Sequence, residues 1–163
     1  GMVNNGFGYI GTGLGAESHV NITGAGSQWT NAHSLFVGDA GGHGTLLIEN
    51  GGTVSNGYGV IGSGTGTGTK GAVIVTGENS RWSNLGDLNL GNSGTGTLTV
   101  EEGGAVLTGR AGYVGYGAGA FGAVTVLGEG SSWESSLGIY VGVFGNGELS
   151  IKEGGRVSGY GGT

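Results

Sequence analysis

Short apolar runs bounded by glycine recur along the whole chain. In one set, two apolar residues flank a residue that varies, and these pairs are Val20/Ile22, Leu46/Ile48, Val73/Val75, Leu98/Val100, Val124/Val126 and Leu149/Ile151. The residues between them, Asn21, Leu47, Ile74, Thr99, Thr125 and Ser150, are expected to point outward. A second set ends in an apolar residue followed by Gly, at Ile10, Val37, Ile61, Leu90, Val114 and Val141. The alternation predicts two short β-strands per unit, and no run has a helical period.

Three tryptophans mark a long repeat. Trp29, Trp82 and Trp133 close related hexamers at residues 24–29, 77–82 and 128–133, and they lie 53 and 51 residues apart. Each long repeat divides into two similar halves, which place Trp29, Val54, Trp82, Val106, Trp133 and Val157 in one column at intervals of 24 to 28 residues. A fixed period of this kind is typical of folds in which each repeat stacks on its neighbours.

These observations predict an all-β chain folded as a parallel β-helix (β-solenoid) of about six coils, with two coils per repeat. The Trp/Val column is expected to begin a third short face, and parallel strands would stack at about 4.8 Å per coil. We expect one solenoid over residues 1–163, with a partial repeat at 1–28, repeats at 29–81 and 82–132, and a partial repeat at 133–163. A two-sheet sandwich is the alternative, but it requires hairpins and antiparallel order. Because the chain stops within a repeat, we expect it to be a piece of a longer surface protein.

Large and small residues alternate between neighbouring coils. The tryptophan coils also carry Leu35, Leu88 or Ile139, whereas the valine coils have Gly8, Gly59 or Gly112 at the matching position. This pattern favours tryptophans packed in the core against the valines of adjacent coils. The alternative is that the tryptophans line a surface on which sugars stack.

Composition narrows the class of protein. Gly makes up 45 of 163 residues and Pro is absent, but the glycines do not follow the three-residue period of collagen. The net charge is −6 and the five basic residues are scattered, which argues against nucleic acid as a partner. There is no cysteine for disulfides or thiolate chemistry. No apolar run approaches the length of a membrane span, so we expect no membrane insertion of this segment.

Several motifs resemble the glycine-rich passenger repeat of bacterial autotransporters and related type V secretion proteins, a repeat also seen in PEP-CTERM-associated proteins. They are Thr-Leu-Thr-Val-Glu-Glu-Gly-Gly at 97–104, Tyr-Val-Gly at 113–115 and 140–142, Val-Thr-Val at 124–126, and Gly-x-Gly-Ser-x-Trp at 24–29 and 128–133. The resemblance covers nearly the whole chain and departs at Glu78, Asn79 and Lys70. It implies a β-helical passenger exported through its own outer-membrane β-barrel, which is absent from this chain, and displayed on or released from a Gram-negative cell.

The residue types that carry catalysis or metal binding form no recognisable set. Pectin-cleaving β-helices require clustered carboxylates, but Asp39 and Asp87 do not align in the repeat. Glu49, Glu101, Glu102 and Glu153 gather at one corner, as a solvated ridge or alternatively a weak cation site. His19, His33 and His43 lack ligand spacing, and the loop glycines near residues 13–15 and 64–68 lack a nucleotide-binding context. We therefore expect no catalytic, cofactor-binding or metal residues, and no cofactor.

The sequence thus predicts a non-enzymatic, secreted cell-surface passenger domain that acts as an adhesin or as a rigid stalk. A surface glycan or protein of a host or the environment is the expected partner. The alternative is a carbohydrate-binding or carbohydrate-processing β-helix. Acidic and aromatic side chains aligned along one lateral face would favour that alternative.

Overall fold

The computed structural model describes residues 1–64 and 68–160, and these residues form strands and turns without any helix. The strands are β1 (Met2–Asn5), β2 (Gly8–Thr12), β3 (Glu17–Thr23), β4 (Gln28–Asp39), β5 (His43–Glu49), β6 (Thr53–Ser63), β7 (Lys70–Thr76), β8 (Arg81–Asn84), β9 (Leu88–Leu90), β10 (Thr95–Glu101), β11 (Ala105–Thr108), β12 (Gly112–Val114), β13 (Phe121–Leu127), β14 (Ser132–Ser135), β15 (Ile139–Val141), β16 (Asn146–Lys152) and β17 (Arg156–Gly159). The all-β prediction is confirmed. Gly66 and the last three residues of the final partial repeat lie outside the described residues.

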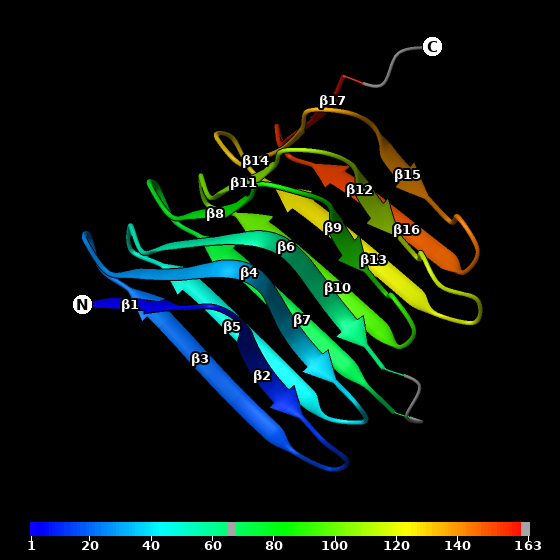
Figure 1. Ribbon diagram of the computed structural model, residues 1–163. Coiled ribbons are helices and arrows are strands. Elements are labelled where there is room, and N and C mark those ends of the chain that lie inside the picture. Colours follow the sequence, from blue (N-terminus) through cyan, green and yellow to red (C-terminus); the bar gives the residue numbers. More distant parts are fainter. Residues whose placement is uncertain (65–67, 161–163) are drawn as a thin grey trace.

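The strands wind into a solenoid, and the chain advances steadily from one coil to the next (Figure 1). β1, β2 and β3 form the first coil, β4 and β5 the second, and β6 and β7 the third. The fourth to sixth coils have three strands each, and β17 follows them and pairs with β14. The last strand of each of the six coils belongs to one sheet, in the order β16-β13-β10-β7-β5-β3, and the remaining described strands form a second sheet. All pairings between described strands are parallel, as expected for a solenoid rather than a sandwich.

The register between coils confirms the columns expected from the sequence. Trp29 pairs with Val54, Val54 with Trp82, and the series continues through Val106, Trp133 and Val157. Two details differ from expectation. The faces that carry this column and the Gly-terminated strands belong to one sheet, because β4 and β6 run across the bend between them. β2, β4 and β6 also extend two residues past their expected apolar ends, to Thr12, Asp39 and Ser63.

The core is a continuous stack of the inward-facing side chains. Leu46, Ile48, Val75 and Val100 are fully buried within it, along with the apolar residue that precedes glycine in each of β4, β6, β9 and β12. Their inward position follows from the two-residue side-chain period of a strand. In the outer coils the equivalent residues are less covered, and Ile151 is 50% exposed because β16 is the edge strand of its sheet among the described residues.

Each tryptophan occupies space that the preceding coil leaves open. Trp82 is completely buried, and a Cβ atom on Gly59 would meet its ring at 2.9 Å and the Leu88 side chain at 2.8 Å. The indole N–H of Trp82 donates to Oδ1 of Asn56 over 2.7 Å. Trp29 and Trp133 donate in the same way to the preceding coil, to Asn5 and Thr108. The core interpretation of the tryptophans is therefore confirmed, and they do not form a surface for stacking sugars.

The corners depend on glycine and on buried serine. Gly62 has φ of +70°, and a Cβ atom there would collide with the backbone carbonyl of Thr95 in the next coil. At the opposite corner, the buried hydroxyls of Ser80 and Ser131 accept hydrogen bonds from the backbone N–H groups of Gly51 and Gly103 over 3.0 Å. These bonds explain the serine of the second and third hexamers, because it connects two coils where the ladder is interrupted.

Candidate functional site

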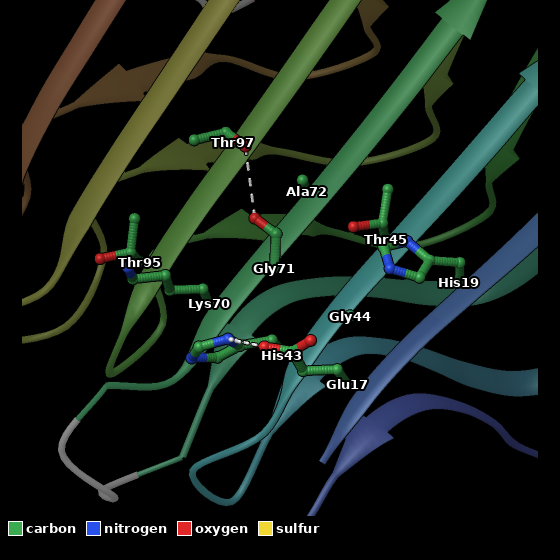
Figure 2. Close-up of a pocket in the computed structure, with 10 residues that line it drawn as sticks. All are labelled: Glu17, His19, His43, Gly44, Thr45, Lys70, Gly71, Ala72, Thr95 and Thr97. Carbon is green, nitrogen blue, oxygen red and sulfur yellow. Dashed lines mark hydrogen bonds and ion pairs between the residues drawn. The ribbon is translucent and has the colours of Figure 1, made fainter. Parts of the chain in front are cut away.

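A shallow groove of about 360 Å³ lies on the outer face of the sheet formed by β3, β5, β7 and β10 (Figure 2). We call it the sheet groove. Glu17, His43, Lys70 and Thr95 form one row along its lower part, and His19, Thr45, Ala72 and Thr97 form the second row above them (Figure 2). The groove is hollow because Ala72 contributes only a methyl group between the larger neighbours in its row.

The groove holds a fixed imidazole between two partners. The Nε2 atom of His43 lies 2.8 Å from the carbonyl oxygen of Gly68, so it is the donor nitrogen in this contact. Its Nδ1 atom lies 3.7 Å from a carboxylate oxygen of Glu17, a contact that is an ion pair only when the imidazole is protonated. The hydroxyl of Thr97 donates to the carbonyl oxygen of Gly71 over 3.3 Å. These hydroxyl, imidazole, ammonium and carboxylate groups are suited to hydrogen bonding with a polar ligand.

An aromatic cluster occupies the outer face of the first two coils, on the other sheet. We call Phe7, Tyr9, His33 and Phe36 the N-terminal aromatic cluster. Tyr9 and Phe36 are register neighbours, and their rings stack with centroids 5.1 Å apart and an angle of 8°. Phe7 lies 4.8 Å from the ring of His33 and also stacks on Tyr9. Phe7 and Tyr9 remain about half exposed despite these ring contacts.

A second aromatic cluster lies on the fifth and sixth coils and consists of Tyr113, Tyr116, Tyr140 and Phe144. We call it the C-terminal aromatic cluster. Tyr113 and Tyr140 are register neighbours whose ring centroids are 5.3 Å apart at 17°, and Tyr116 lies 5.0 Å from Tyr113. Phe144 meets Tyr116 edge to face at 6.2 Å and is 71% exposed.

Two charged groups adjoin Tyr113, one from the preceding coil and one from its own coil. The guanidinium Nε of Arg110 lies 3.6 Å from a carboxylate oxygen of Asp87, which also accepts a hydrogen bond from the backbone N–H of Ala111. Partial burial, followed by the nearby Asp87 carboxylate, raises the pKa of the Tyr113 phenol, although Arg110 acts in the opposite direction. A tyrosine phenol is already neutral at ordinary pH, and the raised pKa of Tyr113 extends that neutral range to higher pH.

The acidic residues singled out in the sequence remain dispersed. Register places Glu49 and Glu101 in one column with Thr76 between them, so these two carboxylates are two coils apart, about 10 Å. Glu49 accepts a hydrogen bond from Asn21, and Glu102 accepts one from Thr76. Among residues 1–64 and 68–160, no three His, Asp or Glu side chains gather closely enough to hold a metal ion.

Asp39 and Asp87 lie on different parts of the coil, as their positions in the repeat predict. Asp39 is the last residue of β4 and accepts hydrogen bonds from Ser63 and Thr12, whereas Asp87 precedes β9 and contacts Arg110.

The described part of the chain contains no helix long and apolar enough to cross a membrane.

Comparison with known proteins gives one informative relative. Over 95 residues the chain is 35% identical to the adhesin BmaC autotransporter of Brucella suis biovar 1 (strain 1330). The match covers 55% of this chain but only 3% of that relative, so the chain spans a small part of the curated protein it matches. No model of a protein family and no solved structure matches the chain. The chain is thus a parallel β-solenoid with similarity to a segment of an autotransporter adhesin.

Sequence reasoning missed the sheet groove and both aromatic clusters. One coil spans 26 residues between β3 and β5, so the coil period already places Glu17 beside His43 and His19 beside Thr45. The clusters follow from the residue before each Gly-terminated apolar position, which is Tyr9, Phe36, Val60, Asn89, Tyr113 or Tyr140 in successive coils. Reading that outward column coil by coil would have found them.

Proposed function

We propose that this chain is part of a non-enzymatic passenger domain of an autotransporter-like protein, displayed at the bacterial cell surface, where its lateral faces adhere to another surface. The parallel solenoid and the similarity to an autotransporter adhesin support this proposal. Export would use an outer-membrane β-barrel that is not part of this chain. The partner would be a glycan or protein on a host or environmental surface.

The observation that favours an adhesin over a stalk is the contrast between inward and outward positions. Inward positions keep the same chemistry in every coil, as in the column that pairs Leu98 with Val73 and Val124. Outward positions change from coil to coil and gather exposed aromatic rings in two places. A spacer requires only the inward pattern, whereas exposed apolar clusters of this kind are typical of interaction surfaces.

Competition for attachment separates an adhesin from a stalk. Bacteria that carry the full protein would be allowed to attach to a surface that they colonise, with and without the purified chain in solution. An adhesive segment occupies the same receptors, so the soluble folded chain should reduce attachment, whereas the heat-unfolded chain should not. If the folded chain leaves attachment unchanged over the range in which it remains soluble, the segment is a stalk and the adhesive proposal is wrong.

Surface display has its own test. Antibodies against the purified chain should label intact cells, and external protease should remove that label without cell lysis. Labelling that appears only after the cells are permeabilised would contradict the proposed location.

A further inference from the structure

The C-terminal aromatic cluster is not required by the fold. Its central column contains Tyr113 and Tyr140, but the register-equivalent residues of the third and fourth coils are Val60 and Asn89, and those coils stack with the same pairing. Phe144, in the turn after β15, has most of its surface in water. An exposed ring in a turn adds little to stability, so its place beside three tyrosines calls for an explanation outside folding.

We propose that the C-terminal aromatic cluster binds neutral carbohydrate, with a sugar ring stacked on the exposed face of Phe144. The proposal rests on the adhesive function proposed above, because it names the class of partner for the same lateral surface. Phe144 meets Tyr116 edge to face, with an angle of 75° between the rings, and it is 71% exposed, so ring surface remains available to a ligand. Rigid aromatic side chains lose little conformational entropy on binding and are frequent anchors of interfaces.

The polar groups around the rings are suited to bind the hydroxyl groups of a sugar. A sugar presents an apolar face of C–H groups and a rim of hydroxyls that both donate and accept hydrogen bonds. Tyr113, Tyr116 and Tyr140 supply phenolic hydroxyls, which are neutral at ordinary pH and also donate and accept hydrogen bonds. A purely apolar protein partner would leave such hydroxyls without hydrogen bonds at a cost in affinity.

Charge favours a neutral ligand over an ionic one. The charged side chains beside Tyr113 are Asp87 and Arg110, and they face each other at 3.6 Å, so the surface there has no unpaired excess of either sign. The chain as a whole carries a net charge of −6, which disfavours sulfated or uronic acid polymers. The sheet groove, with Lys70, Glu17 and two histidines, has a different character and lies on the other sheet.

Affinity electrophoresis of the purified chain through gels that contain glucan, mannan or galactan provides the first test. At least one neutral polysaccharide should retard the folded chain, and oligosaccharides of that polysaccharide should bind in titration calorimetry. Retardation only by sulfated or uronic acid polymers, with binding lost in salt, would show charge-driven association and overturn the proposal. Failure of all neutral polysaccharides to retard the chain would overturn it as well.

Substitutions at one turn residue then separate ring stacking from general apolar contact. Phe144→Ala and Phe144→Leu should each weaken oligosaccharide binding about tenfold or more, a loss of the size expected for an interface anchor. Phe144→Tyr, which keeps the ring, should bind within about threefold of the original chain. Leu14→Ala is the matched control, because Leu14 is an 85% exposed apolar residue outside both clusters. Unchanged binding in Phe144→Leu would contradict stacking.

The two proposals fail in distinguishable ways. If the soluble chain still competes for bacterial attachment but binds no neutral glycan, the adhesive function stands and the carbohydrate inference is wrong. If Phe144→Ala abolishes glycan binding but the soluble chain does not compete, the carbohydrate site stands and the adhesive function is wrong. Circular dichroism and melting of each variant would confirm that the solenoid is intact, as expected for a side chain that lies in solvent.

Discussion

The tryptophans show how single residues set the length of the repeat. The ring of Trp82 lies over Gly59, and its indole N–H donates a hydrogen bond to Asn56. The preceding coil therefore supplies both the space for the ring and the acceptor for the N–H. A coil with tryptophan therefore requires a neighbour with glycine at that position and a hydrogen-bond acceptor three or four residues earlier. This complementarity makes two coils, rather than one, the unit that recurs every 51 to 53 residues.

Trp82→Ala should destabilise the protein by about 3–5 kcal/mol. The substitution removes the largest fully buried side chain of the central coils and leaves a cavity beside Gly59, which has no side chain to fill it. Denaturant unfolding measures the change in free energy. The control is Leu85→Ala, three residues away at a position that is 79% exposed, and it should stay within about 0.5 kcal/mol of the original chain. Equal effects of the two substitutions would contradict the buried position of Trp82.

Residue-level predictions from sequence succeeded where burial controls the residue type. The Trp/Val column and the paired apolar positions repeat because the core permits few alternatives, so their period is visible in one sequence. Outward residues such as Phe36, Val60 and Asn89 occupy one column without sharing a chemistry. No pattern along the chain therefore marks the aromatic clusters, which become apparent only when residues are grouped by coil.

At the level of strands and corners, the ends of the strands were harder to locate than their centres. β4 and β6 continue through the bend, whereas the later coils break there into pairs such as β8 and β9. The second and third coils differ in the number of residues at this bend, and the register shifts between Asn31 and Ser34 as a result. Because the bend contains no inward apolar residue that recurs, the hydrophobic pattern cannot determine where one strand ends.

The corner glycines provide a test that separates backbone strain from steric exclusion. Gly62 and Gly24 both have positive φ, +70° and +89°, but a Cβ atom at Gly62 would meet the backbone of Thr95 whereas one at Gly24 would meet nothing within 4 Å. Gly24→Ala should therefore cost about 1–2 kcal/mol, the strain of a left-handed residue with a side chain. Gly62→Ala should cost about 2–5 kcal/mol, because overpacking is added to that strain. Thermal or denaturant unfolding checks both values, and equal costs would mean that the coils can separate at this corner.

At the scale of the whole molecule, each coil is stabilised mainly by the two coils that contact it. The central strands β7 and β10 have neighbours on both sides, whereas β3 and β16 are the edges of their sheet. Burial follows the same order, since Val75 and Val100 are fully buried but Ile151 is half exposed. Stability should therefore be distributed along the solenoid and not shared equally by all coils.

Native-state hydrogen exchange should resolve that distribution. Amides of β7 and β10 should exchange most slowly, because breaking their hydrogen bonds requires disruption of packed coils on both sides. Amides of β16 and β17 should exchange faster, since the end coil can open while the rest of the core stays intact, and β3 should behave similarly at the other end. Repeating the measurement on Trp82→Ala should accelerate exchange chiefly in strands β6 to β11, which adjoin the altered coil. Uniform protection from β3 to β16, lowered equally everywhere by the substitution, would show that the solenoid unfolds as a single cooperative unit.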